Sequence, residues 1–274
     1  MKSFISRTVV KLAQRISPSV KAKLLSIPCV AHIRDLIYRG AKIQPFLIPG
    51  LPFNLTLYVN VENPAERAFI TTHYEPHVVQ YLLRTIKDGW VAFDIGAFIG
   101  FYSILLGKLC GKGRVIAFEP IESLQNQILL SAKANKLANI HVEPVAVGER
   151  SGMRKLWVHE GANGYFGTSS SLVRSGGKRE RIVKVVSIDE YICVNQLSHV
   201  DFIKIDVEGA ELDVLIGAKE TLKQIGPIVL VEFNTAEDQE QGEKFLSSIG
   251  YVCKEIGHSS YGVHIIAVKG ERKQ

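Results

Sequence analysis

Four acidic residues stand at or near the ends of short apolar segments, where a side chain can reach a ligand. They are Asp94, Glu119, Asp206 and Glu232. In open parallel sheets the carboxyl ends of the strands share one edge, and ligands bind in the crevice outside it. Carboxylates there can accept hydrogen bonds from ribose, take a proton from a hydroxyl or hold a hard cation. The spacing therefore predicts one acidic edge built from four separate segments.

The segment VAFDIGAFIGFYSILLGKLCGKGRVIAFE, residues 91–119, indicates how the first two acids are positioned. It predicts a strand, a turn with Gly96 and Gly100, a helix from Phe101 and a second strand that ends before Glu119. Glycine permits positive φ and lets a ligand approach the backbone. An acid nineteen residues beyond Gly100 suits ribose hydroxyls. The third glycine of the dinucleotide fingerprint is missing, which disfavours a nicotinamide cofactor, and a glycine turn in an unrelated α/β protein stays an alternative.

A second acidic group lies in DFIKIDVEGAE, residues 201–211. The pattern predicts a strand that ends at Asp206 and a helix that begins near Glu208. Acids in the first turn of a helix are favoured by its dipole, so a capping role stays open for some of them. A further strand over 226–233 carries Glu232, and Asn234 follows it.

The remaining chain alternates between strand and helix patterns, which predicts a doubly wound, mostly parallel sheet. Helices are expected over 76–87 and 121–136, and either a β-hairpin or an extended lead-in over 46–61. A strand is expected over 140–147 and a closing antiparallel pair over 251–256 and 263–268. In the 140–147 strand, Val145 and Ala146 either border an adenine ring or belong to the core. Segments 153–159 and 181–188 predict a β-hairpin insertion whose Gly-, Ser- and Thr-rich loop either closes over a ligand or only connects the strands.

We expect residues 1–45 to form a separate basic arm and residues 46–274 to form the α/β domain that carries the acidic edge. The first 44 residues carry nine Lys or Arg and one acid, so the rest of this +6 chain is slightly acidic and offers no broad nucleic-acid face. Apolar residues at helical spacing predict an amphipathic helix that either contacts an anionic membrane or packs on the domain. Because no apolar run is long enough to span a bilayer and no signal-peptide core is present, we expect a cytoplasmic protein, with peripheral membrane contact as the open variant.

Cysteines and histidines give weaker signals. The four cysteines, Cys29, Cys110, Cys193 and Cys253, lack zinc spacing and are expected to be reduced core thiols. Three histidines in or near loops are candidate contributors to the site: His73, His77 and His258.

Four of these segments, FDIGAFIGFYS, VIAFEP, SIDEYI and DFIKIDVEGAE, together resemble the FkbM family of S-adenosylmethionine-dependent O-methyltransferases over about residues 75–235. The resemblance implies a seven-stranded class I methyltransferase sheet, S-adenosyl-L-methionine as cofactor, and methyl transfer to a hydroxyl of a sugar or other natural product. At Phe98 the family more often has Asn. The residues that match the cofactor site are Asp94, Gly96, Ala97, Gly100, Glu119, Pro120, Val145, Ala146 and Asp206, and the catalytic candidates are Asp206, Glu208 and Glu232, with Asp206 first.

Three alternatives remain at this point. We predict an active site without a metal. The rival mechanism is one in which Asp206, Glu232 and Asn234 hold a Mg²⁺ ion. The chain could instead be a non-catalytic nucleoside-binding or scaffolding protein with the same fold. An oxidoreductase is a third possible class of function. The expected partner is a small-molecule or glycan acceptor, and the oligomeric state is open.

Overall fold

A seven-stranded sheet forms the centre of the computed structural model, which describes residues 43–48, 51–71, 74–158, 172, 179–259 and 261–270. Its strand order is β11-β12-β10-β9-β3-β4-β5. The five parallel strands are β3 (Val91–Ile95), β4 (Arg114–Phe118), β5 (Ile140–Glu143), β9 (Phe202–Ile205) and β10 (Ile228–Phe233). At the far edge β12 (Val263–Lys269) runs antiparallel to β10 and to β11 (Tyr251–His258). The predicted doubly wound, mostly parallel sheet is confirmed.

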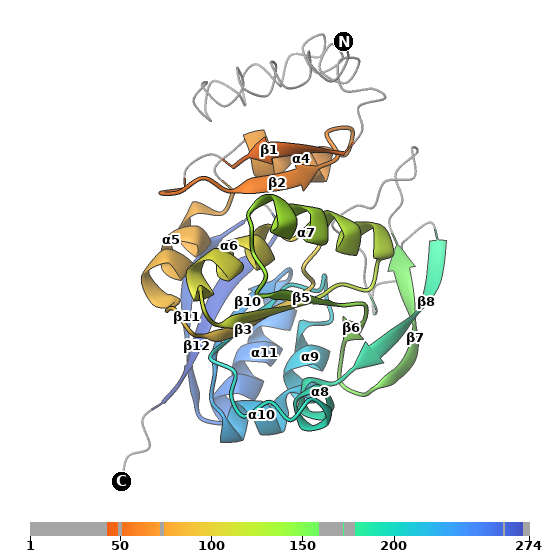
Figure 1. The fold of residues 1–274 in the computed structure, drawn as a ribbon. Helices are drawn as coiled ribbons and strands as arrows, with labels where there is room; N and C mark the ends of the chain where they lie inside the picture. The colour runs from red at the N-terminus through yellow and green to blue at the C-terminus, as the bar shows by residue number, and fades with distance from the viewer. Residues whose placement is uncertain are drawn as a thin grey trace, which may run out of the picture.

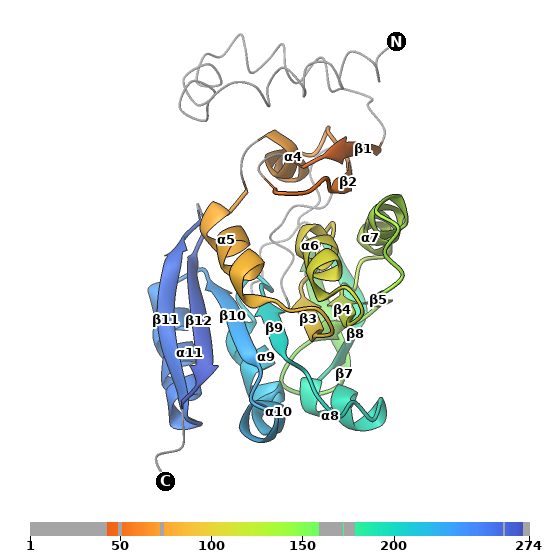
Figure 2. The same cartoon turned by 60° about the vertical axis from the view of Figure 1, so that its left-hand side comes forward.

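Helices cover both faces of this sheet (Figures 1 and 2). One layer contains α5 (Pro76–Thr85), α6 (Phe101–Cys110) and α7 (Glu122–Ala134), and the other contains α9 (Glu211–Gly217), α10 (Lys219–Gln224) and α11 (Ala236–Ser248). A strand covered on both faces must be apolar on both, and all four residues of β9 are buried. In β3, Ala92 joins the core cluster beneath α5 to α7, while its neighbour Phe93 joins the opposite cluster. Side chains alternate across a strand, so one short segment anchors both layers.

The predicted lead-in hairpin is present as β1 (Gln44–Leu47) and β2 (Thr56–Val59), and α4 (Pro64–Thr71), which we did not predict, follows it. The backbone N–H of Tyr58 donates to Ser131 Oγ at 2.9 Å, which ties β2 to α7. The hairpin is therefore part of the domain. Residues 1–42 lie outside the described residues, and so does the predicted arm helix. Among the described helices, none has both the length and the apolar character needed to cross a membrane.

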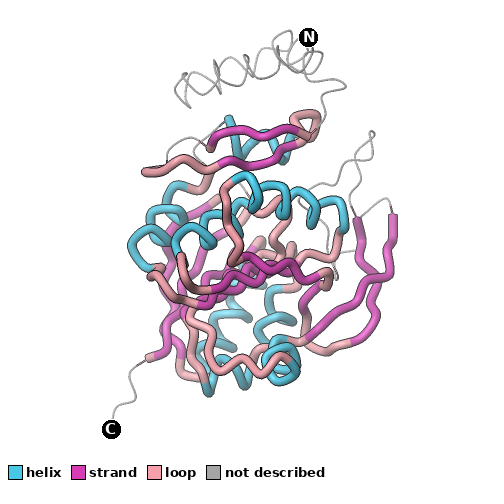
Figure 3. The backbone as a smooth tube through the Cα atoms, in the orientation of Figure 1, coloured by secondary structure: helices cyan, strands magenta, loops and turns pink. Residues whose placement is uncertain are grey.

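The predicted single strand over 140–147 is wrong. Pro144 has no N–H to give to a ladder, and the chain leaves the main sheet after β5. It continues as β6 (Ala146–Val147), which joins β7 (Gly152–Val158) and β8 (Arg179–Val186) in a separate three-stranded sheet beside the central one (Figure 3). The antiparallel β7 and β8 confirm the hairpin insertion.

Two further expectations are corrected. Helix α9 begins at Glu211 and not near Glu208, because Glu208 (φ 58°) and Gly209 (φ 104°) form a left-handed turn after β9. Glu211 Oε1 accepts the N–H groups of Val207 (3.2 Å) and Gly209 (2.9 Å), so this acid supports the turn. Cys193 lies in the unpredicted α8 (Ile188–Val194) and is exposed, so it is not a core thiol.

Candidate active site

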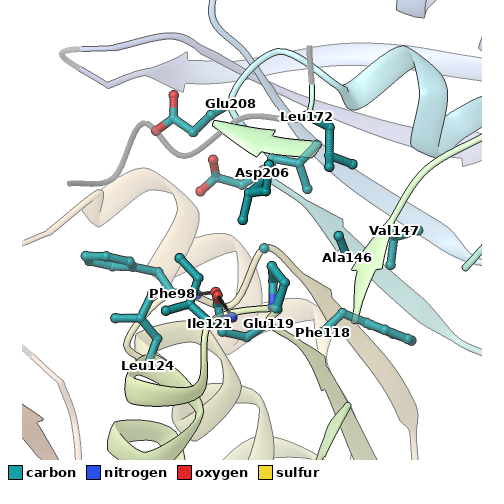
Figure 4. Close-up of a pocket in the computed structure, with 14 residues that line it drawn as sticks. Phe98, Phe118, Glu119, Ile121, Leu124, Ala146, Val147, Leu172, Asp206 and Glu208 are labelled. Atoms are coloured by element: carbon teal, nitrogen blue, oxygen red, sulfur yellow. Dashed lines mark hydrogen bonds between the residues drawn. The ribbon is translucent and has the colours of Figure 1, made fainter. Parts of the chain in front are cut away.

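A pocket lies at the carboxyl ends of β3, β4 and β9, the edge that the sequence predicted (Figure 4). It encloses about 580 Å³ of empty space, part of it open to solvent. The residues that line it are Gly96, Phe98, Phe118, Glu119, Pro120, Ile121, Leu124, Ala146, Val147, Leu156, Leu172, Asp206, Val207 and Glu208. Acids thus face each other across mainly apolar walls, an arrangement suited to a ligand with a flat apolar part and several polar groups.

The glycine turn after β3 is shaped by the neighbouring backbone. Gly96 has φ 79°, and a Cβ there would lie 1.9 Å from the carbonyl oxygen of Asp206. Only glycine fits that contact. Gly100 also has positive φ, but a Cβ there would meet Ile128 of α7 at 2.8 Å, so its small size serves the packing of α6 against α7 and Gly100 does not line the pocket.

Glu119, at the end of β4, is held by two backbone donors. Its Oε2 accepts the N–H of Phe98 and its Oε1 accepts the N–H of Ile121, both at 2.9 Å. The residue is only 5% exposed, and this burial raises its pKa to about 8 despite the two donors. Each oxygen keeps a free lone pair, so the carboxyl group can still accept hydrogen bonds from a diol.

Asp206 belongs to a buried charge network with Lys204 and Asp94. Lys204 Nζ lies 3.0 Å from Asp206 Oδ2 and 3.8 Å from Asp94 Oδ1. Burial alone would lower the pKa of Lys204, but the two carboxylates raise it above its usual range, which keeps the ammonium charged. Asp94 is fully buried, accepts a hydrogen bond from the Ser103 hydroxyl and does not line the pocket. Asp94 therefore acts on the pocket through its charge, on Lys204 and on Glu119, whereas Asp206 lines the pocket directly.

Glu208 sits in the left-handed turn and faces the pocket from the side opposite Glu119 (Figure 4). Its Oε2 accepts a hydrogen bond from Asn234 Nδ2 at 2.8 Å. Burial, followed by the nearby charge of Asp206, raises its pKa to about 8. Phe98 (φ 52°) is, beside Glu208, a second non-glycine pocket residue with positive φ, a conformation that Asn adopts more readily than Phe. Strained backbone of this kind concentrates at functional sites.

Glu232 lies one strand further along and does not line the pocket. It pairs across the ladder with His264 of β12 and accepts a hydrogen bond from the Ser259 hydroxyl. Burial and the charges of Asp206 and Glu75 raise its pKa. The ligands of the rival Mg²⁺ hypothesis, Asp206, Glu232 and Asn234, have other partners here, because Asp206 pairs with Lys204 and Asn234 donates to Glu208.

The predicted residues thus divide into two groups. Those that line the pocket are Gly96, Glu119, Pro120, Ala146, Asp206 and Glu208, and those that do not are Asp94, Ala97, Gly100, Val145 and Glu232. Of the candidate histidines, His77 contacts His264 (3.0 Å between ring nitrogens), and His258 is an exposed partner of Glu255. His73 lies outside the described residues.

Sequence reasoning missed the part of the apolar pocket wall that comes from the insertion, and it missed two buried polar residues outside the pocket. Leu156 of β7 and Leu172 line the pocket, so the insertion contributes to it. Glu75 and His264 are buried beside Glu232. No spacing rule could have found them, because they come from distant segments. The only sequence signal for His264 is its place in an otherwise apolar strand.

Comparison with known proteins gives three findings. A family model described as the methyltransferase FkbM domain matches residues 94–262, more than half of the chain. Hexuronic acid methyltransferase AglP of Haloferax volcanii is 27% identical over 173 residues, which are 63% of this chain and 68% of AglP. The crystal structure of methyltransferase FkbM from Methylobacillus flagellatus KT matches with a TM-score of 0.51 and 19% identity, over 68% of this chain and 45% of that one. The chain thus spans less than half the length of that protein, and this likeness shows a shared fold.

Proposed function

Since the chain belongs to the FkbM methyltransferase family, we propose that it transfers a methyl group from S-adenosyl-L-methionine to a hydroxyl of a sugar or related small-molecule or glycan acceptor. One observation carries this proposal: Glu119 stands across a single pocket from Asp206 and Glu208 (Figure 4). One side of the pocket can hold a ribose, and the other can hold positive charge and take a proton.

The residues present fit this cofactor. Gly96 brings the backbone of the β3 turn against Asp206 without a side chain between them. Glu119 offers acceptors for ribose hydroxyls, and apolar walls that include Leu124 and Ala146 suit an adenine ring. Asp206 suits the positive end of the molecule. When bound, S-adenosyl-L-methionine supplies an electrophilic methyl group on a sulfonium.

The acceptor hydroxyl needs a group to take its proton, and the sequence placed Asp206 first. The geometry supports Glu208 instead. Among the described residues, the lone pairs of Asp206 Oδ2 are engaged by Lys204 Nζ at 3.0 Å, whereas Glu208 accepts one hydrogen bond from a neutral amide and has a pKa raised to about 8. A base whose pKa lies near the working pH is the most effective. Glu232 would act from outside the pocket.

The acceptor class is the least constrained part of the proposal. AglP is named for hexuronic acid, and the match to it supports a sugar hydroxyl as the first acceptor to test. The insertion contributes Leu156 and Leu172 to the wall of the same pocket, and we propose that this wall contacts the acceptor.

The test is a methyl-transfer assay with the full chain. Purified protein is incubated with S-adenosyl-L-methionine labelled in the methyl group and a panel of glycosides that includes hexuronic acids. We expect S-adenosylhomocysteine release that depends on the acceptor, with the label on a sugar oxygen by mass spectrometry and NMR. Binding of the cofactor without release for any hydroxyl acceptor would support the non-catalytic alternative, and label on nitrogen or carbon would refute O-methylation.

A further inference from the structure

Outside the pocket, a cluster of three buried side chains joins α5 to the antiparallel edge of the sheet. Glu232 of β10 and His264 of β12 are direct partners in the ladder, so their side chains lie on the same face. Glu75 immediately precedes α5, where it has φ 40°. Their side chains are 7%, 2% and 7% exposed for Glu232, His264 and Glu75. None of the three lines the pocket described above.

The donor atoms are spaced as metal ligands. His264 Nε2 is 3.3 Å from Glu75 Oε2 and 3.6 Å from Glu232 Oε2, and one donor atom from each residue lies within 4.8 Å of the other two. A metal bound at about 2.1 Å to imidazole nitrogen and carboxylate oxygen places neighbouring donors about 3.4 Å apart in a tetrahedron. One cation could therefore contact all three with little movement of the chain.

His264 Nε2 is buried and has no hydrogen-bond partner among the described residues, although Glu75 Oε2 lies 3.3 Å away. A buried polar nitrogen without a partner is costly and needs an explanation. Here it points between two carboxylates, and a cation would satisfy it and both acids at once.

The surroundings supply the outer contacts that metal sites use. His264 Nδ1 lies 3.0 Å from His77 Nε2, which fixes the orientation of the imidazole, and the Tyr102 hydroxyl donates to Glu75. The Ser259 hydroxyl donates to Glu232 Oε1, the oxygen that does not face His264. The close approach of His77 itself depends on Gly257, where a Cβ would lie 2.7 Å from the imidazole ring.

From this geometry we propose that Glu75, Glu232 and His264 form a binding site for a divalent transition-metal cation of the zinc, cobalt or manganese class. One nitrogen and two carboxylate ligands match that class better than Mg²⁺, which prefers oxygen ligands alone. Three protein ligands leave a further coordination position for water. The cation would fasten the start of α5 to strands β10 and β12. The competing arrangement is an imidazolium held between two carboxylates without any metal.

The experiment measures metal binding to the full chain and not activity. Protein stripped with EDTA and dialysed is titrated with ZnCl₂ by calorimetry and with CoCl₂ by visible absorption. We expect one Zn²⁺ per chain in the wild type, a Co²⁺ spectrum typical of a site with few ligands, and a melting temperature that rises with metal. His264→Gln and Glu75→Gln should each weaken binding at least about 100-fold, and His77→Gln should weaken it about 10- to 100-fold.

His258→Gln is the matched control, because His258 also lies beside a glutamate (2.9 Å from Glu255) but is exposed. It should bind metal as the wild type does. Melting curves without metal show whether each variant is folded. If His264→Gln does not fold, the milder variant His77→Gln still tests the site. A wild type that binds no metal stoichiometrically, or binding that His264→Gln and Glu75→Gln leave unchanged, would overturn the site and favour the imidazolium.

Discussion

The three carboxyl groups of the pocket are held in different ways. Asp206 is paired with a buried ammonium, Glu119 accepts two backbone N–H groups, and Glu208 accepts one side-chain amide. Burial raises the pKa of Glu119 and Glu208 to about 8. The pocket therefore holds two carboxyl groups that can gain or lose a proton near neutral pH.

Glu119→Ala should weaken binding of S-adenosyl-L-methionine by roughly 2 to 3 kcal/mol, because it removes both acceptors for the ribose hydroxyls. Calorimetric titration measures the change. The control is Glu122→Ala, an exposed acid in the first turn of α7 that should leave the affinity unchanged. Circular dichroism must show that the variant is folded, because Glu119 also holds two backbone N–H groups. Equal affinity in a folded Glu119→Ala protein would remove this residue from the cofactor site.

Glu208→Gln should lower turnover by about 10² to 10⁴ and leave cofactor affinity nearly unchanged. A base acts in its deprotonated form, so wild-type turnover should rise with pH through the pKa of about 8, and the variant should lose that rise. The comparison is Asp206→Asn, which removes the alternative base. If Asp206→Asn abolishes the pH dependence and Glu208→Gln retains it, the proton acceptor is Asp206, as the sequence alone suggested.

At the scale of elements, two turns with positive φ pack against each other at the edge of the sheet. The turn after β3 contains Gly96, and the turn after β9 contains Glu208 and Gly209. Their contact point is the Asp206 carbonyl, which leaves no room for a Cβ at Gly96. The strands thus supply a rigid base. The turn after β9 supplies Asp206 and Glu208, and the turn after β3 supplies the backbone that packs against it.

Gly96→Ala should destabilise the protein more than Gly89→Ala, by roughly 1 to 3 kcal/mol, because of overpacking. Both glycines have similar φ, 79° and 87°, so both substitutions carry the cost of a left-handed alanine. A Cβ at Gly89 would meet nothing within 4 Å, whereas at Gly96 it would strike the Asp206 carbonyl. Urea unfolding of the two variants measures the difference. Equal losses of stability would mean that the turn after β3 shifts easily.

At the scale of the whole molecule, stability should fall as pH rises from about 5 to 8. The folded protein raises the pKa of Glu119 and Glu208 to about 8 and of Glu211 to about 7, mainly through burial, from an ordinary value of 4.5. In that range unfolding releases protons, so a higher pH favours the unfolded chain. Calorimetry at about pH 5.5 and pH 8.5 should show a lower melting temperature at the higher pH. Glu211→Gln should reduce this difference in melting temperature. A melting temperature that is constant or rises with pH would show that the raised carboxyl pKa values do not control the stability.

The basic arm gives a separate prediction. If the amphipathic helix expected at the start of the arm binds membranes, the full chain should sediment with anionic vesicles, with about 1 kcal/mol of binding free energy per basic residue near the surface. Salt should weaken this binding, and neutral vesicles should bind far less. A chain without residues 1–40 should not sediment but should keep its cofactor affinity, because the pocket is built from residue 96 onward. If the chain without residues 1–40 still sediments with anionic vesicles, the membrane contact lies in another part of the protein.

The sequence by itself determined the sheet and its acidic edge. Short apolar segments alternating with helical patterns can bury their surface only in a parallel sheet covered on both faces, and β3, β4, β9 and β10 lie where this pattern put them. Gly96, Glu119 and Asp206 follow from the same rule, because their place at strand ends is a local property of the chain.

Only the tertiary structure decided which acids share a pocket and which do not. Glu232 stands at a strand end like Asp206, but it pairs across the ladder with His264, which also contacts Glu75, a residue 157 positions before Glu232 in the chain. Gly100 and Gly96 look alike in the sequence, yet one faces Ile128 and the other faces the Asp206 carbonyl. Such contacts depend on the register of the strands and on the packing of the layers. They arise between segments that the chain brings together only when it folds.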